Sequence, residues 1–336
     1  MSQIQRLLIT GATGCVGSHV AERAAACGIP TVALVRADSQ TDRLRAWNVE
    51  LIPGDLLDPA SLARAVDGVT HVVHCAAKVG DWGPLDEFRA VNVRSLAHLL
   101  EACERTGRVQ RFVHLSSLGV YEAKDHHGTD ETVEPSVSGL DGYTLSKIEA
   151  EQLVRRAIQA NRIAAVILRP GFIYGPRDRT VLPKLLQRLK RRQVKYFGSG
   201  QQLLNNTYVG NLVDAIWLAL EHPQAVGELF NITDTPLVSK RQFIETVARL
   251  AGYPLPTGAV PLGIARRLAT ISEAVYRWCG SKEAPLVSKA RYKFLGLNLD
   301  FSIEKARRVL GYEPRVPFET AMQQTIDWFR TEHLLP

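Results

Sequence analysis

A tyrosine and a lysine four positions apart, Tyr143 and Lys147, are the side chains of this sequence best suited to moving a proton. A spacing of four places both on one face of a helix. The hydroxyl of tyrosine has an ordinary pKa near ~10, and a neighbouring ammonium favours the phenolate and lowers that pKa. The pair therefore predicts a general acid or base that exchanges a proton with a carbonyl or alcohol oxygen.

Two serines supply further hydroxyl groups for the same oxygen. Ser116 and Ser117 follow residues 111–115, which are predicted to form a strand. Side chains at the carboxyl ends of parallel strands face the ligand crevice of such a sheet. One of the two hydroxyls can therefore bond a substrate oxygen beside Tyr143. In the alternative interpretation, both serines only close the end of the strand.

A glycine-rich turn near the N-terminus predicts a dinucleotide site. Residues 6–10 form an apolar run that leads into Gly11-Ala-Thr-Gly14-Cys-Val-Gly17 and then into a small-residue helix at 15–27. Glycines permit a tight turn and a close approach of the backbone to a pyrophosphate, which a helix N-terminus also attracts. The position between a first strand and a first helix favours this interpretation over a simple turn.

The residue that follows the second predicted strand, at 31–35, indicates which nucleotide binds. Arg36 stands where a carboxylate would favour a free 2′-hydroxyl, and a guanidinium can hold a 2′-phosphate. Arg43 can assist it, whereas Asp38 argues for NAD if the turn is shifted. We therefore predict NADP as the cofactor, with NAD as the alternative. A plain surface role for Arg36 is the other interpretation.

An acidic residue after the third predicted strand, at 49–52, is a candidate for the adenine. Asp55 can accept a hydrogen bond from the adenine amino group, and Leu56 can flank the base. Alternatively, Asp55 is the N-cap of the next helix.

The elements that must position these residues alternate along the first half of the chain. Further strands are predicted at 69–75 and 163–168, and helices at 86–105 and 143–161. Apolar strands separated by helices imply a parallel sheet covered on both faces. We predict an α/β fold with a doubly wound parallel Rossmann sheet, formed by an NADP-binding domain at residues 1–170. Residues 171–336 form a smaller, mainly helical substrate-binding lobe, from which residues 205–230 return to the sheet.

Together with further motifs, these residues resemble the extended short-chain dehydrogenase/reductase (NAD-dependent epimerase/dehydratase) family along nearly the whole chain. The segments that carry the resemblance are TGATGCVG, GDL, HCAA at 74–77, VNV at 91–93, LSSLGVY, YTLSK, LRPGFIYGP and NTYVGNLVDA. The resemblance implies that Ser117, rather than Ser116, is the catalytic serine beside Tyr143 and Lys147. It also implies that Asn92 supports the proton relay and that Lys147 binds the nicotinamide ribose.

The cofactor-binding residues that follow from the motifs and the resemblance lie at the ends of several predicted strands. They are Gly11, Thr13, Gly14, Cys15, Val16, Gly17, Arg36, Asp55, Leu56, Ala76, Ala77, Lys78, Tyr143, Lys147, Pro170, Gly171 and Ile173.

One segment indicates a branch of this family. Members that act on nucleotide sugars usually carry R-D-(Y/F)-x-x-V-x-D, but residues 205–211 read NNTYVGN, so the arginine is absent and Asn211 replaces the last acid. This form resembles the 3β-hydroxysteroid dehydrogenase-like branch and its 2-alkyl-3-ketoalkanoate reductases. The implied substrate is hydrophobic, either a steroid-like ketone or a long-chain 3-keto acid. The alternatives are a nucleotide-sugar epimerase or dehydratase and a non-enzymatic NADP-binding sensor.

Two segments of the second half predict surface properties. Residues 264–278 carry apolar side chains near helical spacing, which indicates core packing, a cover over an apolar pocket or a peripheral membrane contact. Residues 184–195 are rich in lysine and arginine and contribute to a formal net charge of +7. They indicate a solvated helix face or attraction to an anionic ligand or lipid surface, and no nucleic-acid module accompanies them.

Composition excludes several other classes of protein. The five cysteines form no C-x-x-C pair, which argues against a disulfide scaffold or a metal site. His71, His74 and His114 are predicted to be core residues rather than ligands. No signal-peptide pattern and no apolar run of ~18 residues is present, which predicts a cytoplasmic protein. The resemblance implies a homodimer through the helices at about 86–106 and 143–161.

Overall fold

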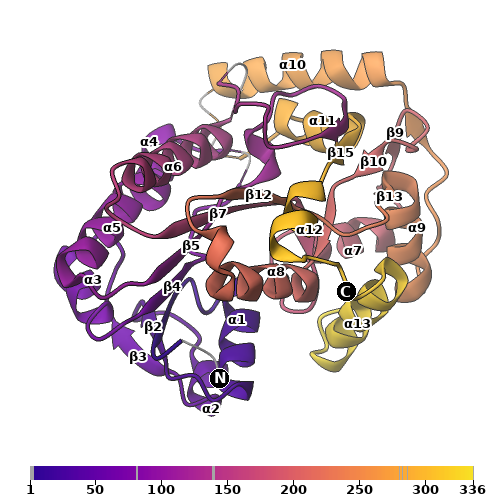
Figure 1. The fold of residues 1–336 in the computed structure, drawn as a ribbon. Helices are drawn as coiled ribbons and strands as arrows, with labels where there is room; N and C mark the ends of the chain where they lie inside the picture. Colours follow the sequence, from indigo (N-terminus) through magenta and orange to yellow (C-terminus); the bar gives the residue numbers. More distant parts are fainter. Residues whose placement is uncertain are drawn as a thin grey trace.

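The fold is built on one sheet of seven parallel strands (Figure 1). The computed structural model describes residues 4–80, 82–137, 141–279, 281, 283–285 and 287–335. Across the sheet the strands follow the order β12-β7-β5-β4-β1-β2-β3, and the predicted doubly wound Rossmann sheet is confirmed. Their bounds are β1 (Leu7–Thr10), β2 (Thr31–Val35), β3 (Glu50–Pro53), β4 (His71–His74), β5 (Arg111–Leu115), β7 (Ala165–Pro170) and β12 (Leu229–Ile232).

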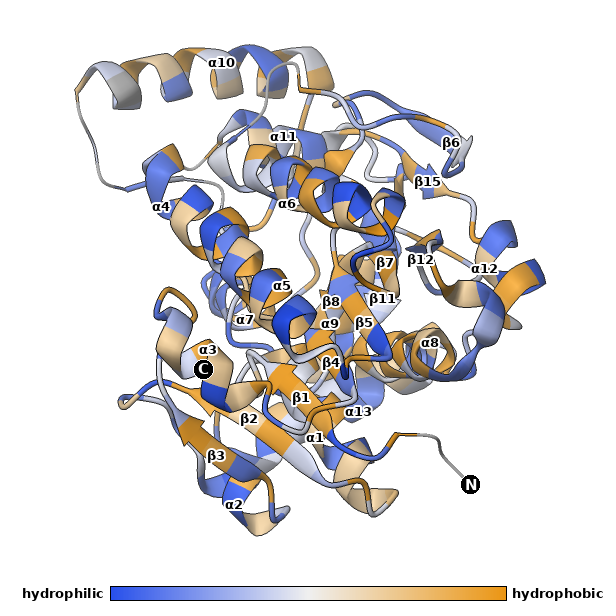
Figure 2. Ribbon diagram, turned by 60° about the vertical axis from the view of Figure 1, so that its left-hand side comes forward, coloured by the Kyte–Doolittle hydropathy of each residue, from blue (hydrophilic) through white to orange (hydrophobic). Residues whose placement is uncertain are grey.

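Helices cover both faces of the sheet because neighbouring strand residues point to opposite sides. Leu7 and Ile9 of β1 pack into the core beneath one set of helices, whereas Leu8 packs into a second core under the other set. The first set is α1 (Cys15–Ala26), α8 (Val209–Glu221) and α12 (Glu304–Leu310). The second is α3 (Pro59–Ala65), α5 (Ser95–Thr106) and α6 (Gly142–Gln159). Figure 2 shows the strongly hydrophobic strands β1 and β2 between these layers.

The predicted helix at 86–105 has a more complex form than its periodicity suggests. It consists of α4 (Leu85–Arg89), a π-helical turn (Ala90–Arg94) and α5, which ends at Gly107 in the left-handed conformation (φ 59°). A short helix, α2 (Asp42–Ala46), lies between β2 and β3. A π-helical turn inserted in a helix is often found at a functional site.

The second lobe combines helices with short strand pairs. Its helices are α7 (Leu182–Lys190), α9 (Lys240–Ala251), α10 (Leu262–Trp278), α11 (Lys289–Gly296) and α13 (Phe318–Thr331). The strand pairs are β8 (Phe172–Tyr174) with β11 (Asn206–Tyr208), β9 (Tyr196–Phe197) with β14 (Ala259–Val260), and β10 (Leu203–Leu204) with β13 (Val238–Ser239). A separate core that includes residues of α7, α9 and α13 holds the lobe together.

The chain crosses between the two lobes more than once. The segment predicted to return to the sheet supplies α8, and the seventh strand, β12, comes at its end. The stretch at 122–142, which lacks periodicity, contains the short strand β6 (His126–Thr129), paired with β15 (Leu299–Phe301). No helix of the described residues is long and apolar enough to cross a membrane.

Candidate active site

The first turn of α6 sets the position of Tyr143. Asp141 is the N-cap of this helix, and its carboxylate accepts hydrogen bonds from the backbone N–H of Thr144 at 2.9 Å and from its hydroxyl at 3.0 Å. Gly142 lies against Phe88 of α4, where a Cβ atom would come within 2.8 Å of the ring. Tyr143 therefore lies at the start of the helix, and Lys147 lies one turn later on the same face.

The two predicted serines have different partners. Ser117 lies beside Tyr143, where its side chain acts to lower the pKa of the phenol, and it accepts a hydrogen bond from the N–H of Gly119 at 3.0 Å. Ser116 instead donates a hydrogen bond of 2.7 Å to the buried carboxylate of Glu151. The structure thus brings Ser117 together with Tyr143 and directs Ser116 into the protein interior.

Burial raises the pKa of Tyr143 to about 12, and the nearby carboxylate of Asp141 acts in the same direction. The side chain of Ser117 opposes this shift only in part. The expectation that Lys147 lowers this pKa is therefore wrong for this structure, because desolvation outweighs any attraction to an ammonium. At neutral pH Tyr143 carries its proton, which suits a general acid.

Lys147 is turned towards the end of β5. Its ammonium donates a hydrogen bond of 2.7 Å to the carbonyl oxygen of Leu115. Burial lowers the pKa of Lys147 to about 8. An ammonium has three N–H donors, so this contact leaves donors for a second ligand.

Asn92 connects the loop after β4 to the first turn of α6 through hydrogen bonds. Its side-chain amide lies in the π-helical turn and is buried. It accepts a hydrogen bond from the N–H of Lys78 at 2.7 Å and donates to the Lys78 carbonyl at 3.0 Å and to Ser146 at 2.8 Å. Ser146 in turn donates to the backbone carbonyl of Tyr143 at 2.7 Å. The geometry makes Asn92 a residue that positions Tyr143.

The glycine turn has the shape that a pyrophosphate requires. Gly11 has a φ of 69°, and a Cβ atom there would lie 2.8 Å from the backbone nitrogen of Ala76. A Cβ atom at Gly17 would lie 2.2 Å from the Gly11 carbonyl oxygen. Gly14 begins α1 without a side-chain cap. The backbone groups at the start of this 12-residue helix therefore fit a bound phosphate.

The other predicted residues of this turn point their side chains into the protein or lie at its rim. Cys15 donates a weak hydrogen bond of 3.4 Å to the carbonyl of Pro176, and burial raises the pKa of its thiol to about 12. Val16 packs against the core, and Thr13 is half-buried. Cys15 and Val16 can thus serve a cofactor through their backbone N–H groups.

Arg36 is free to bind an anion at the end of β2. Its side chain is 70% exposed and makes only a loose ion pair of 3.6 Å with the equally exposed Asp38. A surface pair of this kind contributes little stability. Arg43, by contrast, donates to Glu332 at 2.5 Å and lies over the ring of Trp328, so it holds the C-terminal helix α13.

Asp55 does not cap the next helix. Its carboxylate accepts a hydrogen bond of 2.8 Å from the N–H of Leu57, whereas α3 is capped by Asp58, which bonds the N–H groups of Ala60 and Ser61 at 3.1 Å. The helix-cap interpretation of Asp55 is therefore wrong. Asp55 stays exposed and Leu56 half-buried after β3.

The remaining predicted residues line the same edge of the sheet. The N–H of Ala76 lies 3.4 Å from the Thr10 hydroxyl, and Ala77 follows it before Lys78, whose ammonium forms an ion pair with Glu87. Pro170 ends β7, and Gly171 is packed so closely that a Cβ atom would lie 2.0 Å from a neighbouring carbonyl oxygen. Ile173 lies in β8.

Next to Ser116 lies a buried ion pair that the sequence does not predict. Arg169 of β7 and Glu151 of α6 are each about 1% exposed and form a bidentate pair. Arg169 also donates 2.7 Å to the hydroxyl of Tyr121, which donates to Asn231 at 3.0 Å. Glu151 lies eight residues after Tyr143, two turns along the same face, which is the one signal that could have indicated it.

A second missed residue, Lys293, fixes the loop after Ser117 from the opposite lobe. Its ammonium, on α11, donates hydrogen bonds of 2.7 Å to the carbonyl oxygens of both Gly119 and Tyr121. Burial lowers the pKa of Lys293 to about 8. Nothing in the sequence around position 293 indicates this contact.

The asparagines that marked the family branch have a structural role. Asn211 donates 2.8 Å to the buried carboxylate of Asp234, and Asn206 donates 3.1 Å to the same group. Asp234 also accepts from the N–H of Tyr208 and the hydroxyl of Tyr174, and burial raises its pKa. An aspartate at 211 would place a second carboxylate against it, so asparagine suits this position.

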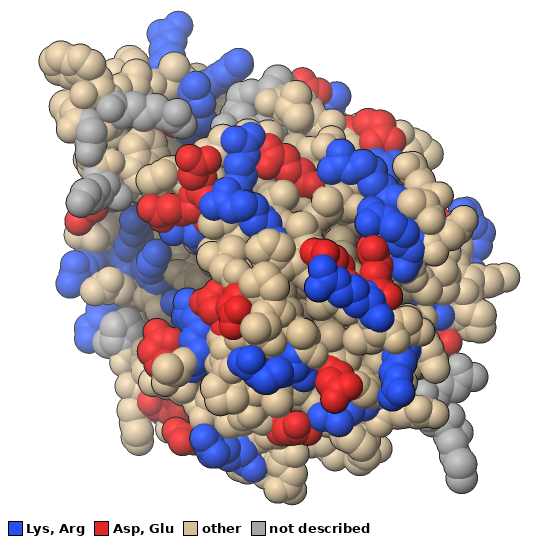
Figure 3. All heavy atoms as spheres, turned by 90° about the vertical axis from the view of Figure 1, so that its left-hand side faces the viewer, with Lys and Arg blue, Asp and Glu red and all other residues tan. Residues whose placement is uncertain are grey.

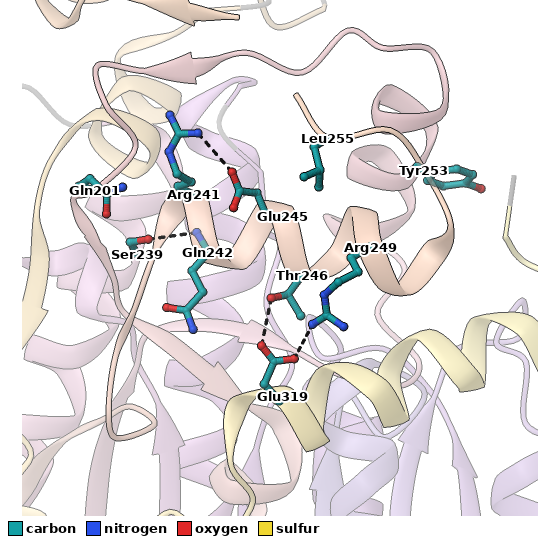
Figure 4. Close-up of a pocket in the computed structure, with 10 residues that line it drawn as sticks. All are labelled: Gln201, Ser239, Arg241, Gln242, Glu245, Thr246, Arg249, Tyr253, Leu255 and Glu319. Carbon is teal, nitrogen blue, oxygen red and sulfur yellow. Dashed lines mark hydrogen bonds and ion pairs between the residues drawn. The ribbon is translucent and has the colours of Figure 1, made fainter. Parts of the chain in front are cut away.

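A separate groove of about 670 Å³ lies along α9 (Figure 4). It contains none of the predicted site residues, and its charged side chains are paired: Arg241 with Glu245 at 3.2 Å and Arg249 with Glu319 at 2.8 Å. This groove is therefore distinct from the site that Tyr143 and the glycine turn form.

The fold and the glycine turn are those of a dinucleotide-binding protein. Comparison of the sequence with family models shows that the chain belongs to the NAD dependent epimerase/dehydratase family, whose model matches residues 7–233. A 2-alkyl-3-oxoalkanoate reductase of Shewanella oneidensis is 27% identical, with 96% of this chain and 86% of that protein covered. A 3 beta-hydroxysteroid dehydrogenase/Delta 5-->4-isomerase of Mycobacterium tuberculosis is 30% identical, with 98% and 91% covered.

A solved structure agrees with this placement. The crystal structure of gox2253 is 30% identical, superimposes with a TM-score of 0.84 and covers 99% of this chain and 100% of its own. The predicted family and its 3β-hydroxysteroid dehydrogenase-like branch are thus confirmed, and the prediction of an oxidoreductase agrees with the names of both relatives.

Proposed function

We propose that this protein is an NADP(H)-dependent oxidoreductase that reduces the ketone of a hydrophobic substrate and catalyses the reverse oxidation of the alcohol. The substrate class is a steroid-like ketone or a long-chain 3-keto acid, which the names of the two relatives support. The observation that carries the proposal is the placement of Tyr143 and Ser117 side by side, near a backbone cradle for a dinucleotide.

The chain's own groups perform the acid-base part of the reaction. When bound, the nicotinamide supplies or accepts the hydride at C4. Ser117 and Tyr143 hold the substrate oxygen between their hydroxyls, and Tyr143 donates its proton to that oxygen as negative charge develops. Lys147 uses its remaining N–H donors for the ribose hydroxyls of the cofactor. Asn92 helps to position Tyr143 through Ser146, which accepts a hydrogen bond from Asn92 and donates one to the backbone carbonyl of Tyr143.

The preference for NADP rests on Arg36. Its exposed guanidinium at the carboxyl end of β2 has no strong partner among the described residues and suits a 2′-phosphate. Titration of the purified protein with NADPH and NADH tests this. The Arg36→Gln variant should lose affinity for NADPH and keep its affinity for NADH. Equal losses for both cofactors would contradict the assignment.

The activity is tested by NADPH oxidation with steroid ketones, 3-keto acids and aromatic aldehydes. The proposal predicts NADPH consumption equal to the alcohol formed, and fastest turnover with an apolar ketone. A tightly retained cofactor with no net oxidation, together with conversion of a nucleotide sugar, would instead indicate an epimerase.

The location and assembly are proposed on separate grounds. All five cysteines are free, which suits the reducing cytoplasm. We propose a homodimer through α5 and α6, a face on which acidic and basic side chains are interspersed (Figure 3), with pairs such as Arg89–Glu149 and Arg105–Glu101. Light scattering after size-exclusion chromatography decides between a monomer and a dimer.

A further inference from the structure

Helix α10 carries an uncovered apolar stripe on the outside of the molecule. Its large side chains Ile264, Leu268, Ile271, Val275 and Trp278 are between 47% and 89% exposed. At about 100° per residue, these positions fall within roughly 80° of one another around the helix. The core-packing interpretation of this pattern is therefore wrong. Figures 1 and 2 both show α10 at the edge of the fold.

The stripe is not the result of a loosely attached helix. One flank of α10, next to the stripe, is anchored by Ala265 and Ala269, which are each 1% exposed, and by Ser272, which donates to the carbonyl of Val287. The segment after the helix is held by the indole N–H of Trp82, which donates 2.9 Å to the carbonyl of Ser281. Because α10 is fixed on its inner side, its apolar residues are held outward.

The charge around the stripe indicates what covers it. Arg267 flanks the stripe at about 60° from its centre and is exposed, with no ion pair among the described residues, whereas the exposed Arg266 lies on the far side of the helix. The one acid of α10, Glu273, is half-buried and accepts a hydrogen bond from the N–H of Lys289 at 3.1 Å.

The basic segment of residues 184–195 ends beside the start of this helix. Lys195 lies against Gly258, and the strand after it, β9, pairs with β14, which leads into α10. The cations of this segment are exposed and have no ion pair among the described residues; they are Lys184, Arg188, Lys190, Arg191, Arg192 and Lys195. Apolar side chains flanked by unpaired cations match an anionic lipid surface.

We propose that α10 docks this protein on the surface of an anionic bilayer, with its apolar stripe in the headgroup region and the neighbouring cations on the lipid charges. The helix lies in the interface and does not span it, in keeping with its length and polarity. A second copy of the chain is a poorer occupant, because an isologous contact through the stripe sets Arg267 near its own copy.

Flotation with vesicles tests the proposal on the full chain and needs no enzyme activity. The protein should float with phosphatidylcholine vesicles that contain phosphatidylglycerol, more weakly with phosphatidylcholine alone, and less as salt is added. The double variant Ile271→Ser/Trp278→Ser should lose binding at least about tenfold. The variant Arg191→Gln/Arg192→Gln/Arg267→Gln should lose most of the preference for the anionic lipid.

The control is Val226→Ser, which removes an exposed valine (44%) far along the chain from α10 and should bind vesicles like the parent. Circular dichroism and NADPH affinity confirm that each variant is folded. Equal flotation of the parent and the Ile271→Ser/Trp278→Ser variant overturns the proposal, as does failure of the parent to bind either vesicle. Self-association of the parent that this variant abolishes, without vesicle binding, assigns the stripe to a second copy instead.

Discussion

The ammonium of Lys147 donates a hydrogen bond of 2.7 Å to the carbonyl oxygen of Leu115, the last residue of β5. The contact ties the helix that carries Tyr143 to the strand that ends just before Ser117. Burial of this ammonium lowers the pKa of Lys147 to about 8, which is a pH at which the activity of an enzyme can be assayed.

The turnover number for ketone reduction should fall as the pH rises through about 8. Lys147 is charged below this pKa and neutral above it, whereas Tyr143, with a pKa of about 12, stays protonated across the interval. A pH profile of kcat measures the inflection. The Lys147→Arg variant keeps its charge at alkaline pH and should lose the inflection even if it is slower. An unchanged inflection in that variant would assign the titration to another group.

Replacing Glu151 should destabilise the fold strongly. In Glu151→Gln the buried Arg169 loses its counter-charge, and breaking such a pair costs about 3–5 kcal/mol of unfolding free energy. Urea denaturation measures this loss. The exposed pair of Arg105 and Glu101 is the matched control, and Arg105→Ala should cost less than about 1 kcal/mol. Similar costs for the two variants would mean that burial does not set the strength of the inner pair.

Gly17→Ala should weaken NADPH binding by at least about tenfold, because the new methyl group would lie 2.2 Å from the Gly11 carbonyl oxygen and deform the turn. Fluorescence titration gives the Kd. Gly263→Ala, also in a helix but with no atom within 4 Å of the new methyl group, should leave the Kd unchanged. An unaltered Kd in Gly17→Ala would show that the cofactor does not use this turn.

Lys293→Met should lower kcat by about tenfold and leave the Kd for NADPH unchanged, because the loss of two charged hydrogen bonds frees the loop that positions Ser117. Steady-state kinetics and a cofactor titration separate the two effects. Lys289→Met, on the same helix but exposed, is the control and should behave like the parent. If the Lys293→Met enzyme keeps its full kcat, Lys293 only connects the two lobes and does not position Ser117.

The parts of the fold with strong local patterns could be predicted from the sequence. The strands at 31–35 and 111–115 have the predicted bounds because they are short, largely apolar segments in which every residue is buried. No sequence pattern separately predicts the strand β12, because its four residues include Asn231, a polar side chain that is buried only through tertiary contacts. The periodicity of residues 264–278 predicts the helix α10, but it does not predict which face of that helix is exposed to solvent.

The residues of the candidate site also fall into those that local motifs predict and those that only tertiary contacts reveal. Tyr143, Ser117 and the glycine turn follow from motifs, since their spacing is local. The contacts of Lys293 and Arg169 join residues 172 and 18 or more positions apart, and only the assembled fold brings these groups together. The direction of the pKa shift of Tyr143 also depends on burial, which spacing does not report.

During ketone reduction, the hydroxyl of Tyr143 is proposed to donate the proton to the substrate oxygen. The most direct measurement compares NADPH-dependent turnover and NADPH affinity in the parent and in Tyr143→Phe. In Tyr143→Phe, kcat should fall by about 10²–10⁴-fold while the Kd for NADPH changes little. Near-parental turnover in Tyr143→Phe, with the cofactor still bound, would contradict it.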